Sequence, residues 1–111
     1  MDTIEWTTVP DVAEALGVEV TKVRQYLREG TLLATRRDGD GPLVIPVAFV
    51  QDGQVVKHLP GVITLLRDAR YADDEAIRWL FADDDLPGSP IEALRENRGT
   101  EVKRRAQALG F

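Results

Sequence analysis

The sequence predicts a mainly α fold with a small β-hairpin wing: a winged helix-turn-helix whose C-terminal helices pack with it as one compact domain. Three patterns predict this fold: two short amphipathic segments joined by a glycine turn, two short apolar runs around a Gly- and Asp-rich turn, and helical periodicity in the rest of the chain. With 111 residues the chain has enough length for one core. We therefore expect residues 1–58 to form the winged helix-turn-helix and residues 59–111 a helical region packed on it as a single unit.

The first helix is expected to begin after Thr8 and to end at Gly17. Thr8 and Asp11 have the spacing of a capping box, in which the threonine hydroxyl accepts a hydrogen bond from a free amide of the first turn. Pro10 is tolerated in that turn, and Gly17 readily takes the left-handed conformation that ends a helix. This two-turn helix has an apolar face made of Val12, Ala13 and Leu16.

A second helix is expected from Thr21 to the residue before Gly30, with Val23, Tyr26 and Leu27 turned inward. In a helix-turn-helix the second helix enters the major groove of DNA, and its N-terminal residues meet the base edges. The candidate base-reading residues are Thr21, Lys22, Arg24 and Gln25. Arg28, one turn further on, is a candidate phosphate contact.

The wing is expected where two apolar runs, Leu32–Arg37 and Leu43–Pro46, flank a turn that contains two glycines and a proline. Arg36 and Arg37 lie just before this turn, where a wing presents side chains to the sugar-phosphate backbone or a minor groove. Asp38 and Asp40 place negative charge beside them. From Val20 to Arg37 the chain still has five basic residues and only one acidic residue.

Four helices are expected in the C-terminal half. Pro60 can open the first, and Asp73, Asp74 and Glu75 place favourable negative charge at the start of the second, which continues to Phe81. Ser89 is expected to cap a third helix that contains Ile91 and Leu94, and the last runs from Glu101 to Leu109.

The composition limits the possible functions. A net charge of −5 and a pI near 4.8 argue against a general nucleic-acid binder that works by phosphate neutralisation alone. Several acidic residues, among them Asp83, Asp84 and Asp85, lie in the C-terminal half, and we expect them to face away from a bound duplex. We expect no metal site, because the lone His58 has no His or Cys partner in the sequence.

The sequence also lacks the motifs of common enzymes. It contains no cysteine, no G-x-S-x-G, no glycine-rich phosphate loop and no H-E-x-x-H. We therefore predict that the protein is not an enzyme and that it has neither a cofactor nor a small-molecule substrate. No secretory leader pattern or long apolar run is present, so we expect no membrane association and a cytoplasmic location, at the nucleoid.

The segment from Thr8 to Pro46 resembles the winged helix-turn-helix domains of excisionase-like and MerR-like proteins. A resemblance over nearly the whole chain is to the Rv2175c-like DNA-binding proteins of actinobacteria. The residues that carry this resemblance are Asp11–Val18, Gln25–Gly30, Val44–Pro46, Gly53–Lys57, Ala76–Phe81 and Glu101–Ala108. The resemblance implies a small winged-helix DNA-binding protein with a helical C-terminal part.

In mycobacteria this family is linked to phosphorylation by a membrane serine/threonine kinase. The resemblance therefore implies such a kinase as a possible partner, and Thr7 and Thr8 at the first helix start are candidate phosphorylation sites. A phosphate there adds favourable negative charge at a helix N-terminus but removes a neutral cap, so the sequence leaves the sign of its local effect open.

Our principal hypothesis is a protein that reads duplex DNA through its second helix and wing and acts as a transcriptional regulator or nucleoid-associated factor. The alternative is a protein-interaction module, an antitoxin-like or adaptor protein whose C-terminal helices bind a protein partner. That alternative is suggested by the acidic pI, and by a similarity of the segment from Trp79 to Val102 to the toxin-binding C-terminal domains of Xre-type antitoxins.

Overall fold

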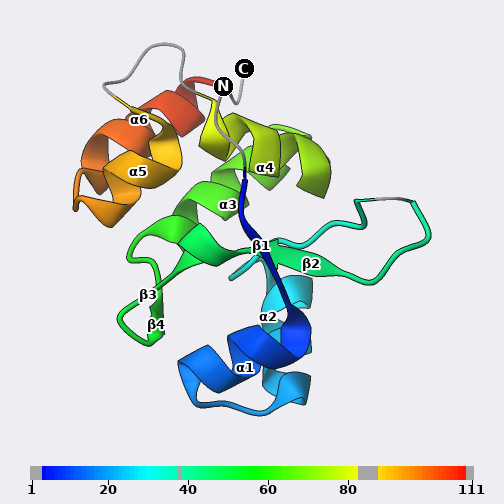
Figure 1. Cartoon of the computed structure of the whole chain (residues 1–111). Helices are drawn as coiled ribbons and strands as arrows, with labels where there is room; N and C mark the ends of the chain where they lie inside the picture. The colour runs from blue at the N-terminus through cyan, green and yellow to red at the C-terminus, as the bar shows by residue number, and fades with distance from the viewer. Residues whose placement is uncertain (1–3, 38, 83–87, 110–111) are drawn as a thin grey trace.

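The computed structural model describes residues 4–37, 39–82 and 88–109. Figure 1 shows α1 and α2 at one end of the molecule, α4, α5 and α6 at the other, and α3 between them. The elements in chain order are β1 (Trp6–Thr8), α1 (Val9–Leu16), α2 (Val20–Glu29), β2 (Val44–Pro46), the 3₁₀ turn η1 (Val47–Phe49), β3 (Val50–Gln51), β4 (Gln54–Val55), α3 (Leu59–Asp68), α4 (Asp73–Phe81), α5 (Pro90–Arg95) and α6 (Gly99–Ala108). The predicted mainly helical fold is confirmed. Asp38 and the run from Asp83 to Asp85 lie outside the described residues.

The ends of α1 and α2 follow the predicted signals. The backbone amide of Asp11 donates to Thr8 Oγ1 at 3.2 Å, and this bond caps the first turn of α1. Gly17 and Gly30, with φ of 70° and 80°, end α1 and α2 in the left-handed conformation. The two short helices therefore meet through a tight turn, as a helix-turn-helix requires.

The wing hairpin is shorter than its two apolar runs suggest. Between its described residues the arms meet at one bridge, where the Thr35 amide donates to the Val44 carbonyl at 3.0 Å and the Val44 amide donates to the Thr35 carbonyl at 2.8 Å. Leu32 and Leu33, earlier in the first run, are both fully buried. Successive residues of a strand point to opposite faces, so two adjacent leucines that enter one core favour an irregular segment over a longer strand.

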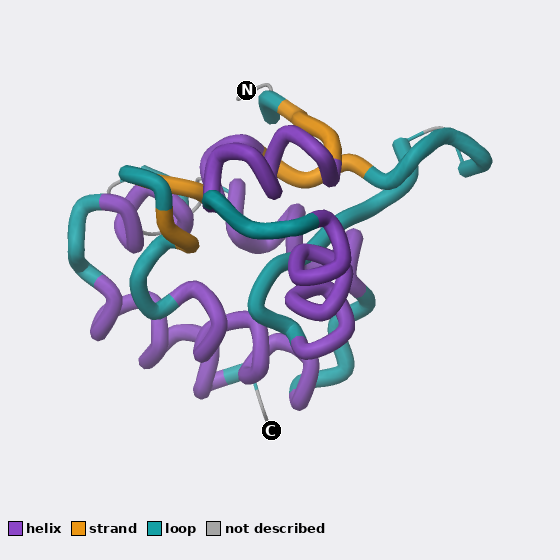
Figure 2. The backbone as a smooth tube through the Cα atoms, turned by 90° about the horizontal axis from the view of Figure 1, so that it is seen from below, coloured by secondary structure: helices purple, strands orange, loops and turns teal. Residues whose placement is uncertain are grey.

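The main partner of β2 is β1, a strand that was not among the predicted elements. The two strands are antiparallel, with Trp6 opposite Pro46 and Thr8 opposite Val44. This pairing fixes the base of the wing beside the start of α1. From there the segment between α2 and β2 reaches away from the helices, as Figure 1 and the view from below in Figure 2 both show.

One hydrophobic core joins the two halves of the chain. It includes Val12 and Val23 from the helix-turn-helix together with Ile63 and Leu80 from the C-terminal helices. Hydrogen bonds also connect the halves, because Arg95 of α5 donates from Nη1 to the carbonyl of Ala48 at 2.8 Å and to that of Val50 at 3.0 Å. The C-terminal helices are thus fixed to the winged helix-turn-helix rather than tethered beside it. None of the helices in the described ranges is long and apolar enough to span a bilayer.

The start of α6 packs tightly against His58, which suggests a direct test of the fold. A Cβ added at Gly99 would lie 2.6 Å from the His58 ring, whereas one added at Gly61 in α3 would meet only the Lys103 side chain, at 3.5 Å. We expect Gly99→Ala to lower the free energy of unfolding by about 1–3 kcal/mol, because the ring or the helix must move. Gly61→Ala is the matched control, and we expect it to be neutral or stabilising. Urea denaturation measures both, and equal stabilities of the two variants would contradict this packing.

Candidate nucleic-acid interface

The exposed face of α2 carries the candidate base-reading residues. Thr21, Lys22 and Arg24 are exposed, as is Arg28 one turn further on, whereas Val23 is completely buried in the core. Because a helix repeats every 3.6 residues, Thr21, Arg24 and Arg28 share one side of α2. Gln25, on the same side, is half-buried, and its Nε2 donates to Glu29 Oε2 at 2.8 Å. Its second amide N–H and its oxygen take no part in this bond, so they could still contact a base.

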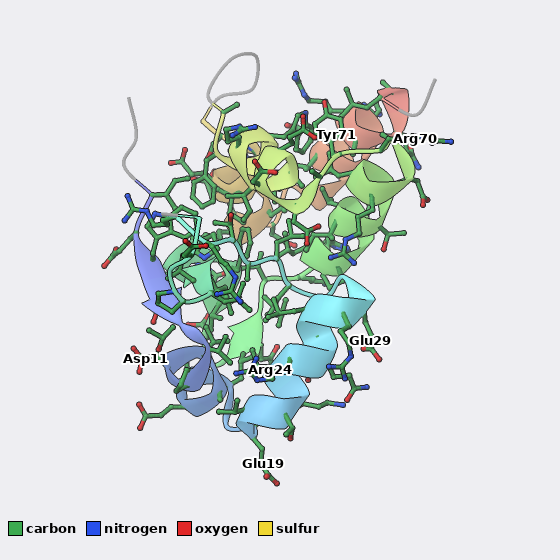
Figure 3. The ribbon with its side chains drawn as sticks, turned by 90° about the vertical axis from the view of Figure 1, so that its right-hand side faces the viewer. Asp11, Glu19, Arg24, Glu29, Arg70 and Tyr71 are labelled. Atoms are coloured by element: carbon green, nitrogen blue, oxygen red, sulfur yellow. The ribbon has the colours of Figure 1, made fainter. Side chains whose placement is uncertain are left out.

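Arg24 of α2 and Arg36 of the wing line the same hollow. This hollow has a volume of about 410 Å³, and its other walls are the start of α1 and the second arm of the wing. Both arginines are exposed, so their guanidinium groups are open to solvent. The described residues that line it are Thr8, Val9, Pro10, Arg24, Arg36, Pro42 and Leu43. Figure 3 shows Arg24 on the side of α2 that faces α1. The fold thus brings together two cations that lie twelve positions apart in the sequence.

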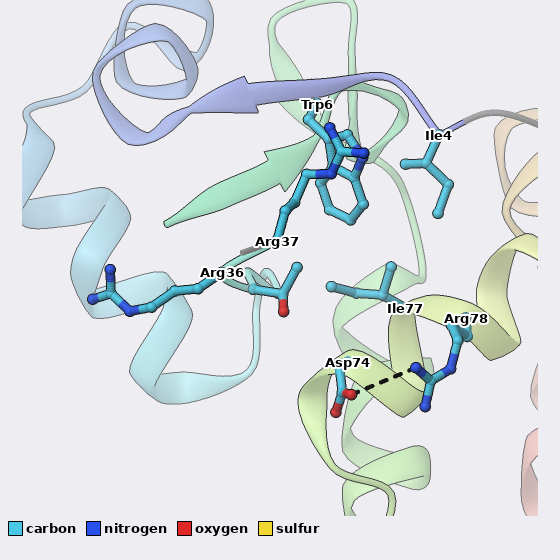
Figure 4. Close-up of a pocket in the computed structure, with 8 residues that line it drawn as sticks. Ile4, Trp6, Arg36, Arg37, Asp74, Ile77 and Arg78 are labelled. Carbon is cyan, nitrogen blue, oxygen red and sulfur yellow. Dashed lines mark ion pairs between the residues drawn. The ribbon is translucent and has the colours of Figure 1, made fainter. Parts of the chain in front are cut away.

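The two wing arginines point in different directions, as Figure 4 shows. Arg36 turns toward the helix-turn-helix and donates from Nη1 to the carbonyl of Gly41 across the wing. Arg37 lies over the ring of Trp6, with its Cζ atom 5.6 Å from the ring centroid. A guanidinium at that distance is attracted to the ring face. The sequence gives no reason to distinguish the two arginines, but the structure gives them different surroundings.

Arg37 borders a second hollow, of about 290 Å³, between the base of the wing and α4. Ile77 and Arg78 of α4 form its opposite wall, and Arg78 is ion-paired with Asp74 at 3.6 Å (Figure 4). Trp6 is half-buried and packs against the core. The contact of Trp6 with Arg37 has no local sequence signal, because the pairing of β1 with β2 brings the two residues together.

A second cation of the candidate interface also lies over an aromatic ring. The Lys22 Nζ atom is 5.4 Å from the centroid of the Tyr26 ring, one turn further along α2. Lys22 nevertheless remains exposed, so its charge is available to a ligand. This contact limits the directions of a long, flexible side chain and holds its ammonium group toward the side of α2 that carries Tyr26.

The acidic residues that begin α4 are partly neutralised by arginines. Asp73 pairs with Arg67 at 3.2 Å, and Asp74 pairs with Arg78. In Figure 1 this end of α4 lies away from α1, although Asp74 also borders the Arg37 hollow. The chain has a negative net charge, but these two carboxylates of α4 are paired and do not lie on the exposed face of α2.

Both candidate phosphorylation sites lie at the start of α1. The Thr7 Oγ1 atom donates to Asp11 Oδ2 at 3.2 Å, and Thr7 is half-buried. Thr8 is exposed, caps α1 and borders the hollow that contains Arg24 and Arg36. A group attached to Thr8 would therefore enter the surroundings of these two arginines.

The short first helix, the exposed basic second helix and the wing define a winged helix-turn-helix protein of the DNA-binding class. Comparison with family models agrees: residues 1–50 match the model described as "DNA-binding protein Rv2175c, wHTH domain", and residues 56–110 match "Rv2175c C-terminal domain of unknown function". The chain belongs to the Rv2175c family. This finding confirms the resemblance noted in the sequence.

Two comparisons cover nearly all of the chain. The DNA-binding protein Rv2175c of Mycobacterium tuberculosis is 47% identical to it, over 93% of this chain and 79% of that protein. The solved NMR structure of Rv2175c has a TM-score of 0.83 and 43% identity, and it covers 100% of this chain and 85% of the solved one. The winged helix-turn-helix fold with helical C-terminal part is therefore common to both proteins. The relative and the matched winged helix-turn-helix family are named for DNA binding, and the absence of an enzymatic activity stays a prediction.

Proposed function

We propose that this protein reads duplex DNA through α2 and the wing, as a transcriptional regulator or nucleoid-associated factor. The observation that carries the proposal is the hollow shared by Arg24 and Arg36, because it places a recognition-helix cation and a wing cation on one exposed surface. The DNA-binding description of the related Rv2175c supports it.

The proposed mechanism assigns two tasks. Thr21, Lys22, Arg24 and Gln25 meet base edges in the major groove, where an arginine can bind guanine O6 and N7 in a bidentate manner. Arg28, Arg36 and Arg37 contact the sugar-phosphate backbone and set the register of the protein on the duplex. No cofactor takes part in this mechanism.

The acidic net charge is compatible with this proposal. A net charge of −5 repels DNA at long range, so affinity has to come from the local basic surface and from base contacts. We therefore expect a protein that binds random DNA weakly and selected sites more tightly. At the nucleoid, such a protein would occupy few sites rather than coat the chromosome.

Fluorescence anisotropy tests the proposal. The full chain is titrated against random-sequence duplex and against a pool of genomic fragments, each at a low and a high salt concentration. We expect salt-sensitive binding and enrichment of particular fragments from the pool. If no duplex binds even at low salt, where electrostatic affinity is greatest, the proposed function is wrong.

We also propose that phosphorylation of Thr8, by a serine/threonine kinase, weakens DNA binding. A phosphate on Thr8 would add negative charge beside Arg24 and Arg36 and would compete with the DNA backbone for them. We expect Thr8→Glu to reduce affinity about tenfold, with Thr100→Glu on the exposed surface of α6 as the charge-matched control. Equal affinities of the two variants would contradict the proposed effect. If mass spectrometry of the native protein finds no phosphate on Thr7 or Thr8, phosphorylation of this site does not regulate the protein in the cell.

The alternative, a protein-interaction module in the C-terminal helices, stays an untested prediction. Among the described residues the one exposed large apolar side chain is Val47, which lies in η1 and not in α3–α6. No described feature of these helices therefore favours an apolar docking face. Pull-down of a stoichiometric protein partner by a full chain that retains no DNA would favour the alternative.

A further inference from the structure

We propose that the C-terminal region acts as a brace for the recognition helix, and that Arg67 is the positioning residue through which it acts. Arg67 lies in the last turn of α3, in the part of the chain that matches a domain described as of unknown function. Its guanidinium group reaches the end of α2, some forty residues earlier in the sequence. The proposal deepens the DNA-binding function, and its DNA part rests on that function.

The contacts of Arg67 join three helices. Nη2 donates to the carbonyl of Leu27 at 3.2 Å, and Nη1 donates to the carbonyl of Arg28 at 3.4 Å. Nε and Nη2 donate to the two carboxylate oxygens of Asp73 in α4, both at 3.3 Å. One guanidinium group thus connects α2, α3 and α4. We call these contacts the Arg67 bridge.

The two carbonyls are those that α2 itself leaves without a partner. The last four carbonyls of a helix have no amide within that helix to bind, and the C-terminal end of the helix carries partial negative charge. The Gly30 and Thr31 amides bind the carbonyl of Tyr26, so the next two carbonyls, of Leu27 and Arg28, are the ones that Arg67 binds. A cation at this end is favourable both as a hydrogen-bond donor and as a charge.

Gly30 leaves room for the Arg67 bridge. This residue is buried, and a Cβ added to it would lie 3.0 Å from Arg67 Nη1 and 3.5 Å from Ile63. The glycine that ends α2 therefore serves two purposes, since its positive φ closes the helix and its missing side chain admits the guanidinium group.

Arg67 does not belong to the row of residues that meets DNA. It binds the C-terminal end of α2, whereas the candidate base-reading residues begin at the N-terminal end. A rigid helix pivots when one end is released, so loss of the Arg67 bridge changes the direction in which Thr21 and Arg24 face a groove. The expected consequence is a loss of affinity without the loss of a phosphate contact.

Hydrogen exchange tests the bridge without DNA. Arg67→Met keeps the apolar stem and removes the donors, and Arg104→Met on the exposed surface of α6 makes the same chemical change away from α2. In Arg67→Met we expect the exchange rate of the last-turn amides of α2 to rise about tenfold more than the exchange rate of the α5 and α6 amides. In Arg104→Met we expect no such difference between the helices. Arg67→Lys should lie between, because one ammonium group cannot hold two carbonyls and a carboxylate together. An unchanged pattern, or a uniform rise across all helices, would overturn the proposal.

Anisotropy on the most enriched fragment tests the consequence for DNA binding. We expect Arg67→Met to lose about tenfold in affinity, Asp73→Asn to lose less, and Arg104→Met to match the unmodified protein. The salt slope of Arg67→Met should stay unchanged, because the residue neutralises no phosphate. Unchanged affinity, or a slope reduced by about one, would overturn the positioning role. If the unmodified protein binds no DNA, the proposed function fails, and the exchange experiment alone decides whether the bridge holds α2.

Discussion

Replacement of Phe49 by alanine is expected to lower the free energy of unfolding by about 3–5 kcal/mol. Phe49 ends η1, is completely buried and packs against Phe81 of α4 with ring centroids 6.0 Å apart. Its ring thus lies where the segment after the wing meets the C-terminal helices. The loss combines the transfer free energy of the ring with the cavity that a smaller side chain leaves.

Thermal unfolding measured by circular dichroism checks this expectation. In a chain of this size the loss corresponds to a decrease in Tm of more than about 10 °C. Val47→Ala is the matched control, because Val47 belongs to the same 3₁₀ turn but is 39% exposed, and we expect it to change stability by less than about 0.5 kcal/mol. Similar Tm values for the two variants would show that this turn does not form part of the common core.

The helices could be predicted because their signals are local. Thr8, Gly17 and Gly30 mark ends that the structure confirms, and Ser89 caps α5 by accepting from the Glu92 amide at 3.3 Å. Each of these signals depends on residues within one turn of the helix end. No long-range information was needed for them.

The strands were harder to predict for two different reasons. The β1–β2 pair joins residues almost forty positions apart, such as Thr8 and Val44, and nothing in either short segment specifies the other. The β3–β4 hairpin was not predicted either, although it has a local signal in the sequence. Asp52 and Gly53 both have positive φ, of 54° and 76°, and an Asp-Gly pair is typical of the two-residue turn that needs this geometry.

The exposure of single residues in the candidate interface could be predicted from the sequence, but their arrangement in space could not. Helical periodicity correctly indicates that Lys22, Arg24 and Arg28 are exposed. Periodicity cannot show that Arg24 shares a hollow with Arg36. The position of the wing depends on the loop after α2 and on the pairing of β1 with β2, and both lie outside the helix. The contact of Arg67 with the end of α2 is equally long-range, and an arginine in the last turn of a helix is too common to signal it.

Reversal of both charges in the shared hollow is expected to abolish most DNA binding. The double variant Arg24→Glu with Arg36→Glu places two carboxylates where the proposed mechanism needs one base-reading and one backbone-binding cation. We expect affinity for the enriched fragment to fall by about a hundredfold or more at moderate salt, about 0.1 M. The salt slope should also flatten by about one, since the lost phosphate contact of Arg36 no longer releases a counterion. Anisotropy titrations at several salt concentrations measure both quantities.

The control must separate the site from the net charge of the protein. Arg70→Glu with Arg104→Glu gives the same net charge from two exposed positions in the C-terminal region, and Figure 3 shows Arg70 at the opposite end of the molecule from Arg24. If the hollow meets DNA, this control loses little affinity, because repulsion between distant exposed charges is screened within about 10 Å at moderate salt. If both double variants lose affinity equally, the effect comes from net charge alone. The shared hollow then has no special part in binding, and the orientation proposed for α2 and the wing is wrong.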